Sequence, residues 1–521
     1  MTTSRSSAAL LAASVLAGLL ATPCAARQEA PAPVPQEGDL VIVGGRLWDA
    51  TGDGARANPG ILIRNGTILH VGEVDVGEAG EVDTGEVDPG AAAPGAVAAA
   101  AVAARAVGRT ASGPETIRLD PGDFIMPGLF DLHAHYAVDL FGEGRVDEYD
   151  VNPVLFLANG VTSTFPAGEV DPEEARRGRE RIASGDLPGP RIYSSGPYWG
   201  SARPGWRSEV MTPDSLRREA AHWALRGVRG FKAKGIEPAQ LRALIEVAHE
   251  HGLTVTGHLD SGFRGSVNPR DAILMGIDRI EHFLGGDALP ASRSAYASLE
   301  SLDMDDAASA APIVAQARLF ARQGTFFDAT LTAYGYFADR EPVVFDYWAD
   351  EMGFLTSYAR GVVEARLPRE ANEQFERIYY VKRNTVKAFY EAGAGDLLTL
   401  GTDHPSWGEF FSGFGAHREL HAMVLAGIPN AAALRAGTVN GARALGVEAR
   451  LGTIEAGKYA DLLVVRGDPL TDITATRRAR LIVRAGELYD PAALLASVRG
   501  RLGPESAEDA AWWKGNLRLG R

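Results

Sequence analysis

The stretch FIMPGLFDLHAH, residues 124–135, joins a mainly apolar segment to a pair of histidines, His133 and His135. Side chains two residues apart on a β-strand point to the same side of the sheet. The two imidazoles can therefore reach one metal ion from the end of a single strand. The stretch predicts a buried strand that ends in a metal-binding pair.

Short apolar segments recur beyond this stretch, and amphipathic segments separate several of them. A helix is predicted at 238–250, where Leu241, Leu244, Ile245 and Ala248 recur at helical spacing. Strands are predicted at 124–132, 160–165, 191–195, 228–232, 253–257, 278–281, 325–331 and 396–401. Eight strands alternating with helices over this length are typical of an α/β fold of the (β/α)8 TIM-barrel type. An open doubly wound sheet has the same periodicity.

Four further polar residues end predicted strands, and they decide between these two arrangements. Lys232 follows VRGF, His258 ends LTVTGH, His282 ends DRIEH and Asp403 ends LLTLGTD. In a barrel the C-terminal ends of the strands meet at one face, so these side chains would join the histidine pair in one pocket. A single strand-end histidine or lysine is more often structural. Six such residues on five strands favour a barrel with an active site.

The segments on either side of this region predict a small composite β-sandwich domain. In the first of them, Asn65-Gly66 separates the strand candidates 61–64 and 67–71, which is typical of a two-residue hairpin. Residues 73–114 are rich in Gly and Glu and then in Ala, and we expect a disordered surface insertion there. The expected parts are a signal peptide at 1–26, an N-terminal β segment at 27–127, the barrel at 128–446, the C-terminal part of the β domain at 447–487 and a helical tail at 488–521.

The first 26 residues are typical of a secretory signal peptide. Arg5 precedes the apolar run 8–20, and Cys24-Ala25-Ala26 offers small residues for cleavage. Cleavage there would remove the only cysteine, so disulfides and thiolate ligands are excluded from the mature chain. We expect a periplasmic or secreted protein with no membrane span after cleavage.

The composition is that of a large globular protein. The chain has 521 residues, of which 45% are hydrophobic and 23% charged, enough for a barrel and an accessory domain. The formal net charge is −15 and no basic run is visible. Nucleic acid is therefore excluded as a partner, because phosphate binding needs clustered Lys and Arg.

Taken together, these motifs resemble the metal-dependent amidohydrolase superfamily, with imidazolonepropionase-like and prolidase-like members as the nearest resemblance. The resemblance rests on MPGLFDLHAH and on the strand-end Lys232, His258, His282 and Asp403. It extends to the flanks through VIVGGRLWDATG, GILIRNGTILHVGE and ALGVEARLGTIEAGKYADLLVVRGDPL. It covers residues 40 to 487 apart from the insertion, and it implies the barrel fold with its β domain.

The resemblance also implies a centre of two divalent metals, with Zn²⁺ as the default and Mn²⁺, Fe²⁺ or Co²⁺ as alternatives. The matching positions are His133 and His135 for the more buried metal, Lys232 for a carboxylated lysine that bridges both, His258 and His282 for the second metal, and Asp403 for the last ligand and catalytic proton shuttle. Lys234 has the same strand parity as Lys232 and stays an alternative for the bridge. Whether one or two metals bind is left open.

The implied activity is hydrolysis of a C–N bond in an amide, peptide or cyclic amide by a metal-bridging hydroxide. The substrate would be a small molecule or dipeptide, and the side chains predicted to contact it are Tyr136, Tyr198, Arg264 and His404.

A mononuclear deaminase is an alternative, although Asp260 stands one position before the glutamate that HxxE would place after His258. A lactonase uses the same metals. A non-catalytic scaffold is disfavoured because every ligand is kept, and a homo-oligomer is left open.

Overall fold

The computed structural model describes residues 33–75, 113–141, 145–335, 342–345, 351–366, 371–405 and 412–519. The predicted signal peptide at 1–26 and most of the predicted insertion at 73–114 lie outside the described residues. Within those ranges, none of the helices combines the length and the apolarity needed to cross a membrane.

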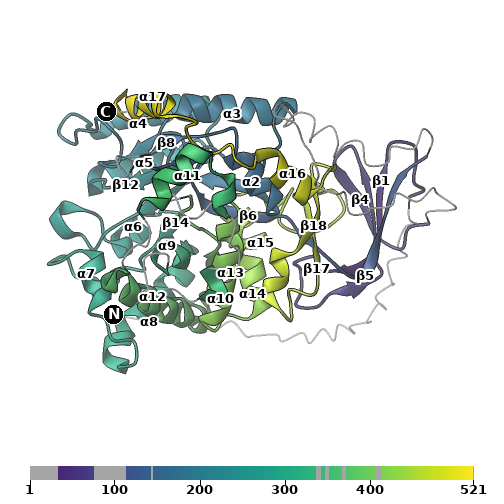
Figure 1. Ribbon diagram of the computed structural model, residues 1–521. Coiled ribbons are helices and arrows are strands. Elements are labelled where there is room, and N and C mark those ends of the chain that lie inside the picture. Colours follow the sequence, from purple (N-terminus) through teal and green to yellow (C-terminus); the bar gives the residue numbers. More distant parts are fainter. Residues whose placement is uncertain are drawn as a thin grey trace, which may run out of the picture.

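The middle of the chain alternates parallel strands with helices (Figure 1). One parallel sheet has the order β10–β9–β6 and a second has the order β11–β12–β13–β14–β15–β16. Their bounds are β6 Leu129–Ala134, β9 Val161–Pro166, β10 Arg191–Ile192, β11 Tyr198–Trp199, β12 Gly230–Lys234, β13 Thr254–His258, β14 Arg279–Glu281, β15 Phe326–Asp328 and β16 Leu398–Thr399. A strand lies at or beside every predicted position, while β11 lies where none was predicted.

Helices cover these sheets, and several of them begin at a capping side chain. In α5, Pro238–Glu250, Gln240 accepts a hydrogen bond from the backbone N–H of Glu237 at 3.2 Å, and the apolar face packs inward as predicted. The other main helices are α2 Asn152–Ala158, α3 Pro172–Ser184, α4 Pro213–Leu225, α6 Pro269–Met275, α7 Ala295–Glu300, α8 Ala307–Gln323, α9 Leu331–Gly335, α11 Ser357–Glu364, α12 Glu373–Phe389, α13 Phe414–Leu425, α14 Asn430–Ala436 and α15 Val439–Ala444.

Backbone hydrogen bonds join the two parallel sheets along one seam. The N–H of Leu132 in β6 donates to the carbonyl of Leu400 at 2.9 Å, and the N–H of Asp403 donates to His133 at 2.8 Å. A parallel bridge also pairs Ala134 with His404. This is an α/β fold of the barrel-like type. In the described residues the paired strands form two sheets without a closed ring, so full closure stays a prediction.

An eight-stranded sheet lies beside the parallel strands, at the right of Figure 1. Its order is β19–β18–β17–β5–β1–β3–β4, with β2 paired to β1, so it combines strands from both ends of the chain. Its bounds are β1 Leu40–Leu47, β2 Arg56–Ala57, β3 Gly60–Arg64, β4 Thr67–Gly72, β5 Glu115–Pro127, β17 Leu462–Arg466, β18 Ala479–Arg484 and β19 Glu487–Tyr489. A two-layer sandwich stays a prediction.

The hairpin predicted at Asn65-Gly66 is confirmed. β3 and β4 pair antiparallel on either side of it, and Asn65 and Gly66 have φ values of 49° and 73°. Both central residues of a type I′ turn need positive φ, which Asn and Gly tolerate best. After β19 the chain ends in two helices, α16 Pro491–Val498 and α17 Ala507–Leu519.

A buried carboxylate ties the eight-stranded sheet to the parallel strands. Asp461, next to β17, accepts hydrogen bonds from Arg191 Nε at 2.8 Å and from Arg191 Nη2 at 3.1 Å. It also accepts one from the backbone N–H of Ala485 at 2.7 Å. The acid is only 5% exposed, and these bonds offset the cost of burying its charge.

Candidate metal centre

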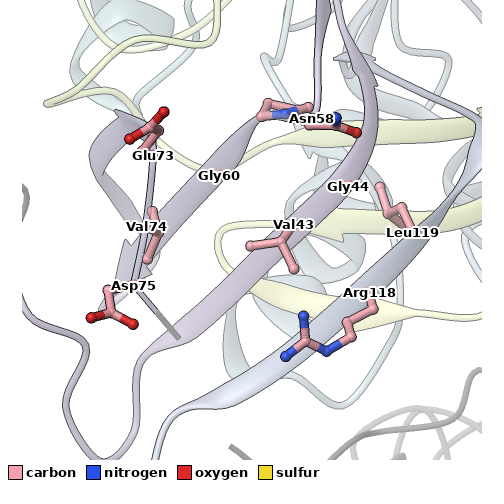
Figure 2. A pocket seen from close by; sticks show the side chains of 10 residues that line it. Val43, Gly44, Asn58, Gly60, Glu73, Val74, Asp75, Arg118 and Leu119 are labelled. Atoms are coloured by element: carbon pink, nitrogen blue, oxygen red, sulfur yellow. The ribbon is translucent and has the colours of Figure 1, made fainter. Parts of the chain in front are cut away.

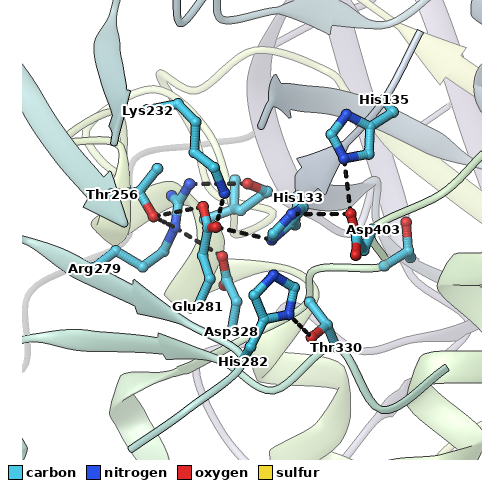
Figure 3. Close-up of polar contacts among 12 residues, drawn as sticks. His133, His135, Lys232, Thr256, Arg279, Glu281, His282, Asp328, Thr330 and Asp403 are labelled. Atoms are coloured by element: carbon cyan, nitrogen blue, oxygen red, sulfur yellow. Dashed lines mark hydrogen bonds and ion pairs between the residues drawn. The ribbon is translucent and has the colours of Figure 1, made fainter. Parts of the chain in front are cut away.

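The predicted ligands lie at the carboxyl ends of neighbouring parallel strands. The register pairs Lys232 of β12 with Thr256 of β13, and His258 of β13 with Glu281 of β14. His282 follows β14 directly, and Asp403 lies four residues after β16, beside the end of β6. The fold therefore brings residues that are up to 270 positions apart to one end of the strands (Figure 3).

Two histidine side chains converge on one carboxylate oxygen of Asp403. Asp403 Oδ1 lies 2.8 Å from His135 Nε2 and 3.3 Å from His133 Nε2. Both histidines are almost fully buried, whereas the Asp403 side chain is 23% exposed and reaches solvent. Ligand atoms of the three residues lie within 4.8 Å of one another, a spacing that one metal ion can bridge.

A second cluster lies directly beside the first. His133 Nδ1 is 3.5 Å from Glu281 Oε2, and atoms of His133, Glu281 and His282 again lie within 4.8 Å of one another. The ring of His282 is 4.8 Å from that of His133 and 4.2 Å from that of His258, centroid to centroid. His258 therefore joins this cluster through His282.

The two lysines of β12 occupy different places. Lys232 is 1% exposed, and its amine forms an ion pair with Glu281 of the second cluster. Lys234 is partly exposed and lines a cavity of about 280 Å³ together with His258, Asp260 and Tyr296. Lys232 is thus the lysine beside the ligands, and Lys234 faces the space in which a substrate can lie.

Burial sets the protonation of the first cluster. It lowers the pKa of His133 well below the usual range, and it lowers the pKa of His135 to about 4, with help from the charge of Arg145. Burial alone would raise the pKa of Asp403, but the hydrogen bonds of the two histidines hold it well below its usual range. Neutral imidazoles and an ionised carboxylate are the states that metal binding requires.

Burial also lowers the pKa values of His258, His282 and Lys232, in each case with help from neighbouring cationic groups. An amine that loses its proton can react with carbon dioxide, as a carboxylated lysine requires, whereas an ammonium cannot.

Some atoms that face this centre have no hydrogen bond in the described part of the chain. They are His133 Nδ1 and His282 Nε2, both buried, whereas Lys232 Nζ and Glu281 Oε2 pair with each other as ions. Buried polar atoms are almost always hydrogen-bonded, so orphaned ones need an explanation. A donor set of imidazoles and carboxylates with vacant lone pairs fits one or two divalent cations.

The backbone at two ligands is strained. His282 has φ 64° and Asp403 has φ 61°, a left-handed conformation that residues other than glycine rarely adopt. Such strain costs on the order of 1–3 kcal/mol per residue and is concentrated at functional sites. The surrounding structure holds these two side chains in place at that cost.

The four residues predicted to contact substrate have different surroundings. Tyr198 is 7% exposed, and its hydroxyl lies at Arg145. Tyr136 is buried, bonds Thr164 Oγ1 at 2.9 Å and stacks on Tyr149 at 4.8 Å. None of the four predicted residues lines the 280 Å³ cavity.

His404 is 1% exposed, and its carbonyl accepts from the N–H of His135 at 2.8 Å. Arg264 is exposed and lies over the ring of Phe263 at 4.9 Å. His404 therefore lies behind the ligands, and Arg264 lies on the surface.

Sequence analysis missed Glu281 and Arg145. Glu281 is fully buried, accepts from Thr256 Oγ1 at 2.8 Å and touches Lys232. Its signal was present, because Arg279 and Glu281 alternate in a short strand and so share one face. Arg145 Nη1 lies 3.2 Å from His135 Nε2, and a loop arginine without a motif gives no such signal.

A larger hollow of about 780 Å³ lies elsewhere, on the eight-stranded sheet (Figure 2). Val43, Asn58, Glu73, Asp75 and Arg118 are among the residues that line it. It contains none of the predicted ligands, so volume does not identify the candidate site.

Comparisons with known proteins agree with this geometry. A family model described as the amidohydrolase family matches residues 124–485. No match was found among curated proteins. Many solved structures share the fold, including the three that follow. A Xaa-Pro dipeptidase with bound methionine has 19% identity and a TM-score of 0.60, with 87% of this chain and 100% of that one covered.

The second is a molinate hydrolase, with 20% identity, a TM-score of 0.59, and 91% and 99% of the two chains covered. The third, ochratoxinase from A. niger, has 18% identity, a TM-score of 0.56, and 88% and 96% covered.

Proposed function

Because the chain belongs to the amidohydrolase family, whose members hydrolyse C–N bonds, we propose that it is an exported hydrolase with two divalent metals. His133, His135 and Asp403 would hold one metal, and His258 and His282 the other. Lys232, carboxylated on its amine, would bridge them. Zn²⁺ is the default metal for imidazole and carboxylate donors, with Mn²⁺, Fe²⁺ and Co²⁺ as alternatives.

One observation carries this proposal. Ligand atoms of two overlapping groups, His133–His135–Asp403 and His133–Glu281–His282, lie within 4.8 Å inside each group. Lys232 contacts Glu281 of the second group, and the buried His133 Nδ1 and His282 Nε2 have no hydrogen bond in the described residues. A packed core would leave no such set of polar atoms together.

Two bound metals of this kind would lower the pKa of a shared water and polarise the scissile carbonyl. Asp403 would take the proton of the attacking water and give it to the nitrogen of the leaving amine as the C–N bond breaks. Its carboxylate is ionised and 23% exposed, so it can reach both water and substrate.

Cationic side chains near the cavity favour a substrate that carries a carboxylate. Lys234 lines the cavity, and Arg145 lies beside Tyr198 and His135 at the same end of the strands. We propose a dipeptide or an N-acyl amino acid, with its carboxylate at Lys234 and Arg145. The dipeptidase among the structural relatives supports this choice over a neutral amide.

The deaminase alternative gains no support from Asp260. Its Oδ1 accepts the backbone N–H groups of Ser261 and Ala295, so it anchors the loop before α7. A lactonase remains an outcome of the substrate test below, because the same metals attack esters. Export rests on the N-terminal signal alone, and secretion to the periplasm or medium tests it.

The experiment compares matched substrates on the mature protein loaded with Zn²⁺. Dipeptides and N-acyl amino acids are each assayed beside the same compound with its carboxylate amidated, together with a lactone series. We expect the acids to be hydrolysed with kcat/KM about tenfold or more above the amides, a typical worth of one charged hydrogen bond. Lys234→Met should remove most of that preference.

Equal rates for acids and amides would overturn the proposal that the substrate carries a carboxylate, but the proposal of a hydrolase would stand. Turnover of lactones alone would overturn the proposal that the enzyme hydrolyses a C–N bond.

A further inference from the structure

The ring of His282 is held from behind by a buried threonine. His282 Nδ1 lies 2.6 Å from Thr330 Oγ1, and Thr330 Oγ1 donates to the carbonyl of Ala329 at 2.7 Å. Lys382 Nζ, on α12, approaches the same hydroxyl at 3.4 Å. These three side chains are 2%, 0% and 1% exposed, so water does not compete for their bonds.

The hydroxyl of Thr330 has a single proton, and this sets the direction of each of its hydrogen bonds. Because that proton goes to Ala329, Thr330 Oγ1 can only accept from its other neighbours. The amine of Lys382 donates to the same oxygen, so it does not change this. A neutral His282 ring must then have its proton on Nδ1, which leaves the lone pair of Nε2 bare. Nε2 is the buried ring atom that has no hydrogen bond in the described chain.

The backbone at Thr330 is strained, which indicates that the surrounding structure holds the hydroxyl in place at an energetic cost. Its φ is 48°, a left-handed conformation that is unusual for a β-branched residue. A carboxylate stabilises the turn, since Glu419 accepts the N–H groups of Leu331 and Thr332 at 2.8 Å each. Glycine or asparagine would fit this φ with less strain, but glycine has no hydroxyl.

Lys382 is in turn fixed by its own surroundings. Its amine lies 3.9 Å from the centroid of the Tyr334 ring and interacts electrostatically with Glu419. These contacts hold the Lys382 amine close to the hydroxyl, to which it donates at 3.4 Å.

We propose that Thr330 is a positioning residue that keeps His282 in its Nδ1–H form and directs Nε2 at the metal shared with His258. The proposal rests on the metal centre proposed above. Hydrogen-bond partners behind a metal-binding histidine typically contribute 10- to 100-fold to metal affinity.

Three variants separate the hydroxyl from the shape of the turn. Thr330→Val keeps the branched shape without the hydroxyl, Thr330→Ser keeps the hydroxyl, and Thr330→Gly removes the hydroxyl and relieves the strain. Lys382→Met is a poor test, because it leaves the Glu419 carboxylate without its neighbouring cation.

Two readouts are measured on each variant. Zinc affinity is determined by competition with a chelator, and the tautomer of His282 is read from ¹⁵N shifts of its ring in metal-free protein, assigned with His282→Gln. For Thr330→Val and Thr330→Gly we expect one zinc to bind about 10- to 100-fold more weakly and Nδ1 to lose its proton preference. Thr330→Ser should behave like the parent in both readouts.

Thr330→Val with parental zinc affinity and an unchanged Nδ1–H ring would overturn the proposal. A Thr330→Ser protein that binds zinc as weakly as Thr330→Val would also overturn it, because the shape of the side chain rather than its hydroxyl would then matter. If the parent protein binds no zinc, the metal centre itself fails. The tautomer in the metal-free protein still distinguishes that failure from a wrong assignment of Thr330.

Discussion

The metal centre and the junction at Asp461 are both buried and charged, but they treat their polar atoms in opposite ways. At the junction, both oxygens of Asp461 accept hydrogen bonds from Arg191 or Ala485. At the centre, the buried His133 Nδ1 and His282 Nε2 lack one among the described residues. Satisfied buried charges hold two parts of a fold together, whereas unsatisfied ones at one spot indicate a missing ligand.

The largest effect should come from removing the ligand that both clusters share. His133 lies 3.3 Å from Asp403 and 3.5 Å from Glu281. We expect His133→Asn to lose metal and turnover together, down to background, in metal analysis and a rate assay on the same sample. If a His133→Asn protein keeps two metals, the contrast between the metal centre and the Asp461 junction is wrong.

Asp403→Asn should separate metal binding from proton transfer. The amide keeps an oxygen that can coordinate weakly but has no basic site. We expect most of the metal to remain and kcat to fall by about 100- to 10,000-fold, the usual worth of a positioned acid–base group. KM should change far less. Turnover within a few-fold of the parent at full metal occupancy would make Asp403 only a ligand, with His404 the next candidate base.

The bridging anion is tested by three matched variants expressed with added bicarbonate. The parent should hold close to two metals per chain, and Lys232→Ala about one, because the carboxylated amine is gone. Lys234→Ala and Glu281→Gln should both keep two, as measured by metal analysis. Loss of metal in Lys234→Ala alone would move the bridge to that lysine. Loss in Glu281→Gln, without any effect of bicarbonate, would make Glu281 the bridging carboxylate.

The smallest effect on chemistry should come from the junction. Asp461→Asn removes the charge that pairs with Arg191 but leaves a similar shape. We expect a loss of about 1–3 kcal/mol in the free energy of unfolding, with metal content and kcat/KM unchanged. Denaturant unfolding of metal-free protein measures it. A fall in kcat/KM at constant stability would show that the junction also shapes the active site.

Much of the architecture could be predicted from local sequence patterns. The parallel strands, helix α5 and the hairpin at Asn65-Gly66 follow from periodicity and turn chemistry, which act over a few residues. Strand β11 was missed because it is only Tyr198–Trp199, and its backbone pairs with β12 rather than with a near neighbour. Too few residues alternate there to give a pattern.

The candidate ligands could be predicted because parallel strands place their carboxyl ends together, whatever lies between them. What surrounds the ligands could not. Glu281 meets Lys232, and Thr330 meets His282, through side-chain directions that depend on register and on left-handed φ values. No local signal marks a threonine that will adopt φ 48°.

The position of β5 in its sheet has a consequence for the order in which the chain is made. One edge of β5 pairs with β1, already synthesised, while its other edge waits for β17, which begins at Leu462. At 5–20 residues per second, that edge stays open for on the order of tens of seconds. An open strand edge is a template for pairing with another chain. Nascent copies crowded on one messenger can therefore join one another through β5 during this interval.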